Sequence, residues 1–230
     1  ADTNYNAVSS SATTVTINQA TPTIAVSNSP LTYNGSAQAA TISGSVAGTA
    51  SSILYDASAT VPTNVGTYAV TADFTPTDTT SYNSLTGASA GNFVITVADQ
   101  SALTVTNTTG TYPTGFTVTT SGGSGGGAVT FTVVDGTATG CSIVPTTGDL
   151  TFTSAGTCTV TATKAADTNY NAISSSATTA TISQADQSAL TVTNTTGTYP
   201  TGFTVTTSGG SGGGAVTFTV VDGTATGCVI

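Results

Sequence analysis

The sequence predicts an all-β protein made of tandem immunoglobulin-like, antiparallel β-sandwich modules. Three observations predict this fold class: the chain is rich in threonine, serine and glycine, apolar and polar residues alternate in short runs, and long segments occur twice. β-Branched residues favour strands, and alternation buries one face of a strand. Long internal repeats indicate an array of similar domains.

The repeats define the expected module boundaries. Residues 98–141 recur unchanged at 185–228, and residues 1–20 recur at 166–185 with changes only at Val8/Ile173, Val15/Ala180 and Asn18/Ser183. We therefore expect the chain to begin and end inside a module. The expected organisation is the C-terminal part of one module at 1–19, a different module at 20–97, a complete module at 98–184 and the N-terminal half of a further module at 185–230.

The two module types share a closing half. GTYAVTA at residues 66–72 aligns with GTCTVTA at residues 156–162, and DTTSYN then aligns with ADTNYN. Duplication of a single sandwich fold of about 100 residues would leave such a pattern.

Strands are expected wherever apolar and polar residues alternate. In AVTFTVV, the apolar side chains of Val129, Phe131 and Val133 share one face, and threonines occupy the other. Because no helical period appears and parallel strands need long crossover connections, we expect two packed antiparallel sheets. The alternating runs of the complete module lie at residues 103–106, 115–120, 128–134, 150–153 and 158–163.

A glycine-rich run, SGGSGGG, occurs at residues 121–127 and again at 208–214. A phosphate-binding loop of this composition would be followed by a helix and usually contains a lysine. Neither feature is present, so we interpret the run as a flexible hairpin or a connection between sheets.

The composition argues against several classes of function. The 230 residues include ten acidic residues, all aspartate, and a single basic residue, Lys164, with no histidine and a net charge of −9. One cation cannot neutralise phosphates, so we expect no nucleic-acid partner, and the lack of a long apolar run predicts no membrane insertion. Without histidine, glutamate or a clustered ligand set, we expect no enzyme activity and no cofactor.

Several segments carry a family resemblance. LTYNGSAQAATISG at 31–44, VGTYAVTADF at 65–74 and YNSLTGASAGNFVI at 82–95 resemble the MBG-type repeats of large bacterial surface proteins. The flanking modules, with GTATGCSI and SAGTCTVTATKAADTNYNA, resemble bacterial immunoglobulin-like repeats. The resemblance implies an adhesin-like stalk architecture and no shared catalytic site.

The cysteines predict a crosslink within the complete module. Cys158 is in phase with buried positions of its strand, and Cys141 and Cys158 are both absent from the middle module, where Tyr68 replaces Cys158. We predict a Cys141–Cys158 disulfide, with two buried thiols as the alternative, and a disulfide implies an extracellular or cell-surface location. Cys228 is equivalent to Cys141, so its partner is expected outside the chain.

The remaining candidate sites each have a structural alternative. Asp99 and Asp186 lie at module junctions and are weak calcium candidates, but no cluster of carboxylates accompanies them. Lys164 is a candidate for an isopeptide bond or an ordinary surface lysine. Asn34, Asn107 and Asn194 lie in glycosylation sequons, and Thr157, Thr159 and Thr161 form a row like those of ice-binding faces. The ordinary composition of an exposed β-surface, rich in threonine and serine, also explains both features.

These observations favour a structural repeat segment of a long extracellular bacterial surface protein or filament. Its expected partners are neighbouring modules of the same chain or identical copies, and its end strands are expected to lie against neighbouring copies or to continue the array. The alternative is an adhesive module that recognises a glycan or a surface protein through loops on a rigid scaffold.

Overall fold

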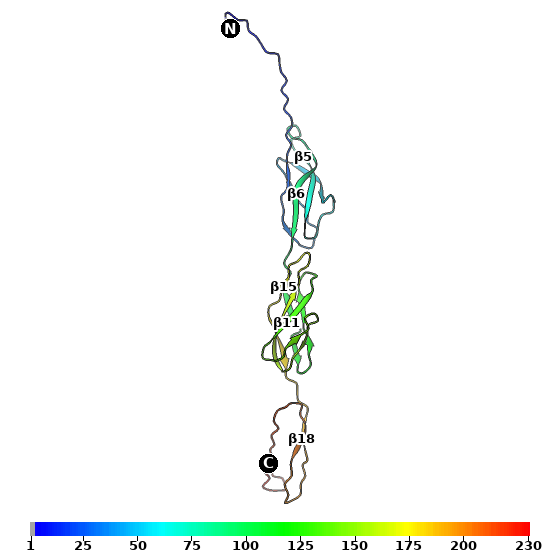
Figure 1. The fold of residues 1–230 in the computed structure, drawn as a ribbon, viewed down its shortest axis with the longest axis vertical. Coiled ribbons are helices and arrows are strands. Elements are labelled where there is room, and N and C mark those ends of the chain that lie inside the picture. Colours follow the sequence, from blue (N-terminus) through cyan, green and yellow to red (C-terminus); the bar gives the residue numbers. More distant parts are fainter. Residues whose placement is uncertain (1–2) are drawn as a thin grey trace.

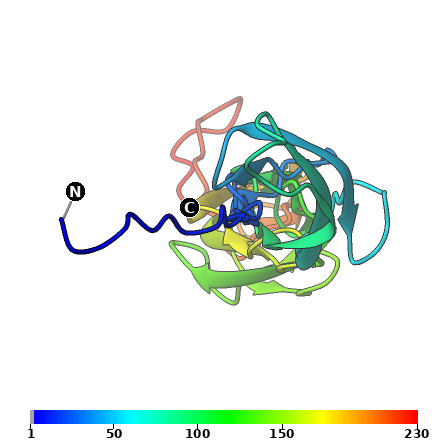
Figure 2. The same cartoon turned by 90° about the horizontal axis from the view of Figure 1, so that it is seen from above.

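The computed structural model describes residues 3–230 and has an extended shape. In Figure 1, an extended N-terminal segment, two strand-rich modules and a C-terminal part follow one another along the long axis. Seen along that axis, the two modules and the C-terminal part overlap, so they are stacked in one line (Figure 2). Residues 3–230 contain no helix, and hence none long and apolar enough to cross a membrane.

The first module has a small sheet and a larger one. Strands β1 and β3 pair with each other, and the larger sheet has the order β2-β6-β5-β4. Phe74, on the central strand β5, is fully buried, and a Cβ atom on Gly44 or Gly48 would clash with its ring. The strands are β1 (Ile24–Val26), β2 (Leu31–Thr32), β3 (Ile42–Gly44), β4 (Gly48–Tyr55), β5 (Gly66–Pro76) and β6 (Leu85–Thr96).

The second module repeats this plan with an added sheet. Strands β7 and β10 pair, the largest sheet has the order β11-β14-β16-β8 with β15 beside β14, and β12-β13-β9 form a third sheet. The strands are β7 (Leu103–Thr106), β8 (Thr109–Thr111), β9 (Phe116–Thr117), β10 (Thr119–Gly122), β11 (Val129–Asp135), β12 (Ser142–Ile143), β13 (Asp149–Thr151), β14 (Gly156–Lys164), β15 (Ile173–Ser174) and β16 (Thr178–Ser183).

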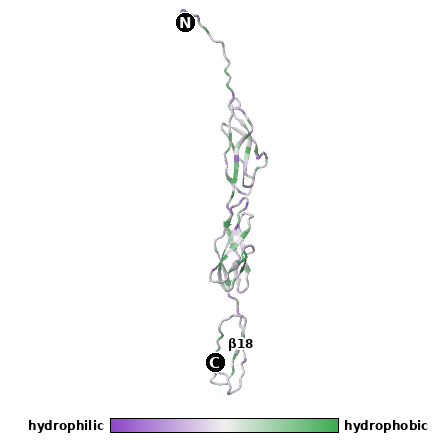
Figure 3. Ribbon diagram, viewed as in Figure 1, coloured by the Kyte–Doolittle hydropathy of each residue, from purple (hydrophilic) through white to green (hydrophobic). Residues whose placement is uncertain are grey.

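Each module buries its own hydrophobic cluster. One cluster includes Val70, Phe74 and Phe93, and the other includes Leu150 and Val160. In Figure 3 hydrophobic residues, in green, lie on the strands of the two modules, and others lie along the N-terminal segment and the C-terminal part. Alternate side chains of the central strands face these cores, which is the arrangement that the period-two pattern predicts.

One short strand in each module departs from the antiparallel pairing that the sequence analysis expected. β2 pairs with β6 in parallel, and β8 pairs with β16 in parallel. No crossover helix is needed, because each pair joins the beginning of a module to its end and the whole module serves as the connection. The assignment of the sandwiches as immunoglobulin-like remains a prediction.

The C-terminal part has the local structure of the second module without its core. Strands β17 (Leu190–Thr193) and β18 (Thr206–Gly209) pair in the register of their identical counterparts β7 and β10. Leu103 is 4% exposed, whereas the equivalent Leu190 is 51% exposed. The same residues are therefore buried in the second module and exposed in the C-terminal part.

Candidate functional site: the joint between two modules

The loop A-D-T-N-Y-N at residues 166–171 lies at the end of the second module that faces the first. The carboxylate of Asp167 accepts hydrogen bonds from the backbone N–H groups of Asn169 and Tyr170, both at 2.8 Å, and from that of Gly126 at 2.6 Å. These bonds, the one from Gly126 first, hold the pKa of Asp167 below its ordinary value. The ionised carboxylate therefore fixes the shape of this loop.

The loop receives the first residue of its own module. The Ala98 N–H donates to the carbonyl of Asn169 at 3.0 Å, and the Asn171 N–H donates back to the carbonyl of Ala98 at 2.9 Å. The first module has the same arrangement at Ala20, whose N–H donates to Ser81 at 2.8 Å and whose carbonyl accepts from Asn83 at 2.9 Å. Both modules thus fix the incoming chain by a pair of backbone bonds.

Side chains of the loop also reach the preceding module. The Val65 N–H donates to Oδ1 of Asn169 at 3.0 Å, and Nδ2 of Asn169 lies 3.3 Å from Oδ1 of Asn64. The ring of Tyr170 packs edge-on against that of Tyr33, with centroids 5.2 Å apart and an interplanar angle of 86°. We call these five residues, together with Ala98, the joint. They link the two modules by polar and aromatic contacts in addition to the peptide bond.

A buried glutamine, Gln100, holds the loop at residues 166–171 through hydrogen bonds to backbone carbonyls next to and within it. Gln100 is 6% exposed, and its Nε2 donates to the carbonyls of Ala165 at 3.1 Å and Asn171 at 2.8 Å. Its Oε1 accepts from the Gly125 N–H at 3.2 Å. The glycine-rich run connects β10 with β11, two strands of different sheets, and its backbone closes over the loop. Because both polar atoms of the Gln100 side chain have partners, burial of this side chain carries no penalty from an unmade hydrogen bond.

The corresponding loop of the first module depends on Asp78. Its Oδ1 accepts hydrogen bonds from the hydroxyl of Thr80 at 2.7 Å, from the Thr80 N–H at 3.0 Å and from the Ser81 N–H at 3.1 Å. These bonds, the Thr80 hydroxyl first, lower the pKa of Asp78 from 3.8 to about 2. The charged form of this carboxylate therefore stabilises the loop that receives Ala20.

The structure joins Cys141 and Cys158 in a disulfide across a sequence separation of 17 residues. Cys158 is fully buried on β14, and Cys141 lies in the segment that leads into β12, so the bond connects two of the three sheets of the module. Cys228 is a free, exposed thiol. The N–H groups of Gly227 and Cys228 donate to Asp222, as those of Gly140 and Cys141 donate to Asp135. Cys228 is thus held in the turn that its paired counterpart uses.

The junction carboxylates do not converge. Oδ1 of Asp99 accepts a hydrogen bond from the Asn171 amide at 2.9 Å, and Asp186 is exposed. Among residues 3–230 no group of three or more His, Cys, Asp or Glu side chains is arranged to hold a metal ion. Nζ of Lys164 donates to the carbonyl of Gly123 at 3.2 Å.

Two of the three sequon asparagines bond to the backbone, and the threonine row lies on a central strand. The side-chain amides of Asn107 and Asn194 donate to backbone carbonyls across their hairpins. Asn34 is exposed, and its Oδ1 accepts a hydrogen bond from the Ser36 N–H at 2.9 Å. The threonines of the row are half-buried, because β14 is a central strand with neighbours on both sides: Thr157, Thr159 and Thr161. Glycosylation stays a prediction.

Sequence reasoning offered Asp99 and Asp186 only as weak calcium candidates and missed the residues that form the joint. The signal that could have found them is the recurrence of A-D-T-N-Y-N at residues 1–6 and 166–171, with a tyrosine and an asparagine kept at Tyr82 and Asn83. The partners Tyr33 and Asn64 carry no such signal, because they belong to the other module type.

Residues 20–99 match the MBG domain family. The middle part of the chain is therefore an MBG-type module, and MBG domains are found in extracellular surface proteins. No curated protein shows significant similarity to the chain.

Proposed function

We propose that this chain is a structural repeat segment of a long extracellular bacterial surface protein or filament, with no catalytic activity and no cofactor. Its partners are neighbouring modules of the same chain or identical copies of it. The joint is the observation that carries this proposal, because a spacer needs modules held in line. The MBG-type module and the disulfide support an extracellular location.

The joint supports a stiff connection for a physical reason. Two modules linked by a peptide alone would sample many orientations, and interfaces between domains are small by default. Here the backbone bonds at Ala98 fix where the chain enters the module, and Asn169 and Tyr170 restrict rotation about that point. Modules that stack in this way add length in proportion to their number.

Small-angle X-ray scattering of the dilute chain tests the proposal. The expected scattering is that of an elongated particle with the two modules end to end. The matched control carries a flexible glycine-serine insertion between Val97 and Ala98, which leaves both cores intact and removes the restriction. If the unmodified chain scattered like this control, the proposed stiff spacer would be refuted.

A further inference from the structure

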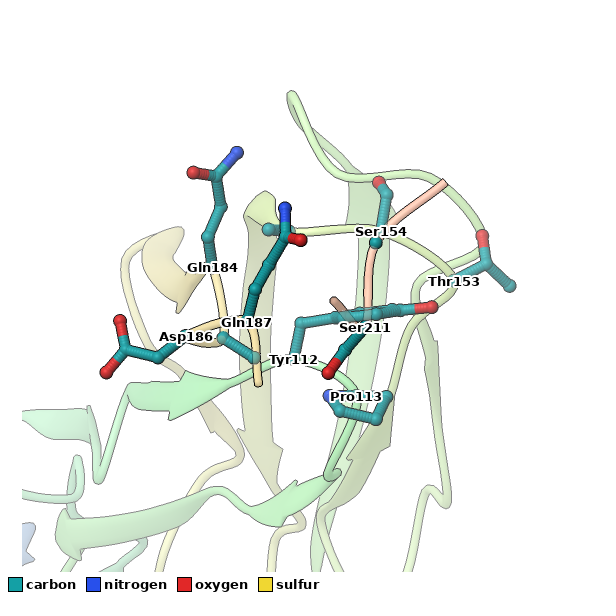
Figure 4. Close-up of a pocket in the computed structure, with 11 residues that line it drawn as sticks. Tyr112, Pro113, Thr153, Ser154, Gln184, Asp186, Gln187 and Ser211 are labelled. Carbon is teal, nitrogen blue, oxygen red and sulfur yellow. The ribbon is translucent and has the colours of Figure 1, made fainter. Parts of the chain in front are cut away.

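The first and the last strand of the largest sheet run in the same direction in both modules. β2 pairs in parallel with β6, and β8 pairs in parallel with β16. β2 and β8 lie near the beginning of their modules, and β6 and β16 lie at the end. Tyr112 and Gln184, which directly follow β8 and β16, border one cavity (Figure 4). Both strands of this pair therefore end at the same pole of the second module.

The chain enters and leaves each module at opposite poles. In the second module, Ala98 is bonded to the loop at residues 166–171, which faces the first module, whereas Gln184 leads away from the first module. The first module is arranged alike, and its strands β5 and β6 run along the long axis of the chain (Figure 1). Tension on such an array would pull the incoming strand toward one pole and the outgoing strand toward the other.

The parallel pairing decides how this tension acts on the hydrogen bonds between the two strands. Because β8 would be pulled at its beginning and β16 at its end, the strands would be sheared along their length. The bonds of a parallel pair are evenly spaced, so they would share the force and have to break together. In an antiparallel pair the two pulled ends would lie side by side, and the bonds would break one after another.

Backbone hydrogen bonds extend the short pair of the second module at both ends. The Thr181 N–H donates to the carbonyl of Thr108 at 2.8 Å, and the Tyr112 N–H donates to that of Ser183 at 2.9 Å. On its other side, β16 is paired with β14 over five residues. The outgoing strand is therefore anchored in the sheet, and the contact that tension strains is the one with β8.

Side chains reinforce the pair of the first module. The Tyr33 N–H donates to the carbonyl of Thr96 at 2.9 Å, which extends the backbone pairing. The Thr96 hydroxyl donates to the carbonyl of Leu31 at 3.2 Å, and the Val94 N–H donates to Oγ of Ser29 at 2.9 Å. Two bonds between the beginning and the end of the module therefore depend on a hydroxyl group and can be removed without a change in the backbone.

We propose that the parallel pairs β2–β6 and β8–β16 are mechanical clamps that keep each module folded when the array is under tension. Detachment of β1 from β3 would lengthen the chain by only a few residues, because β2 follows directly and still holds β6. The core stays closed until β2 slides off β6. This inference rests on the proposed structural role and adds resistance to force along the axis of the array.

Single-molecule force spectroscopy of the full chain, tethered at its two ends in a Cys228→Ser background, tests the inference. The length released on unfolding identifies each module, because reduction of the Cys141–Cys158 bond adds 17 residues, about 60 Å, to the second module alone. Forced unfolding is governed by the unfolding rate. We expect Ser29→Ala combined with Thr96→Val to shorten the lifetime of the first module at constant force roughly tenfold, the scale of one or two lost hydrogen bonds.

The matched control is Tyr55→Phe, which removes a hydroxyl that accepts a hydrogen bond from the Ala40 N–H at 2.8 Å. Tyr55 lies on β4, at the edge of the sheet opposite to β2. This variant should unfold at a lower denaturant concentration, because a buried N–H loses its partner, and its lifetime under force should stay unchanged. Thr96→Val alone removes one bond of the clamp and should have a smaller effect than the double variant.

The outcomes separate the clamp from a general loss of stability. The clamp is overturned if the double variant and Thr96→Val both leave the lifetime of the first module under force unchanged, or if Tyr55→Phe shortens it as much as the double variant does. The proposed structural role can fail separately, because scattering from the dilute chain measures the stiffness of the joint without any applied force. A stiff chain whose first module ruptures equally fast in every variant would retain the spacer role and exclude the clamp.

Discussion

Breaking the Cys141–Cys158 bond should destabilise the second module and leave the first unchanged. Cys158 is 0% exposed and packs in the core, so its replacement would add the cost of a cavity to the loss of the crosslink. Cys141→Ala avoids this complication, because Cys158 then remains as a buried thiol that packs like a small apolar side chain. The first module contains no cysteine and serves as an internal control.

The magnitude follows from the length of the closed loop. For the separation of 17 residues, the chain-entropy model assigns the crosslink about 3 kcal/mol at 25 °C. For a module of this size, that loss corresponds to a fall in Tm of roughly 12–24 °C. The disulfide also connects two sheets, so its loss removes a native constraint as well as one on the unfolded chain.

Differential scanning calorimetry in a Cys228→Ser background measures both modules in one experiment. We expect two transitions, of which only one moves when Cys141→Ala is introduced, and reduction of the disulfide should reproduce the shift. A shift of only a few degrees would show that the bond adds little to the packed core. An equal shift of both transitions would refute the independence of the two cores.

Three further predictions concern acid, core packing and the joint. The pKa of Asp78 is lowered from 3.8 to about 2, so its contribution to stability is complete above about pH 4 and is lost as the pH falls toward 2. The Tm of the first module should therefore fall as the pH is lowered over this range. The fall should be less steep in the Asp78→Asn variant. Leu103→Ala should cost about 2–5 kcal/mol of unfolding free energy in chemical denaturation, whereas Leu190→Ala, in identical sequence but 51% exposed, should change it little. Tyr170→Ala removes an aromatic pair worth about 0.5–1.5 kcal/mol, and residual dipolar couplings should then report looser alignment of the modules while both cores remain folded.

The sequence was sufficient to predict the central strands and which two cysteines pair, Cys141 and Cys158. In GTCTVTA, period two places Cys158, Val160 and Ala162 on one face, and all three are fully buried. The equivalent positions Val70 and Ala72 of the first module are buried as well. These strands could be predicted because a strand with one buried face must alternate apolar and polar side chains, and this alternation is visible in a single sequence.

The joint could not be predicted in the same way. Tyr33 and Tyr170 are far apart in the sequence and belong to modules of different type, so no local period connects them. The parallel pairing of β2 with β6 was missed because a two-residue strand has no measurable alternation. Contacts of this kind depend on how complete modules stack, which is decided by tertiary structure.

The position of the loop couples the stiffness of the joint to the folding of the module behind it. Asn169 contacts Val65 and Asn64 through its side chain while its carbonyl accepts a hydrogen bond from Ala98, and Gln100 and Gly126 bond to the same loop. These groups come from different parts of the second module, so we expect the joint to form only after the module has closed. In an array built on this plan, each joint would become stiff only when the module that follows it in the sequence has folded. An unfolded module would leave a flexible hinge between itself and the preceding module. Leu103→Ala under partially denaturing conditions should therefore loosen the alignment of the two modules even though no residue of the joint has been changed.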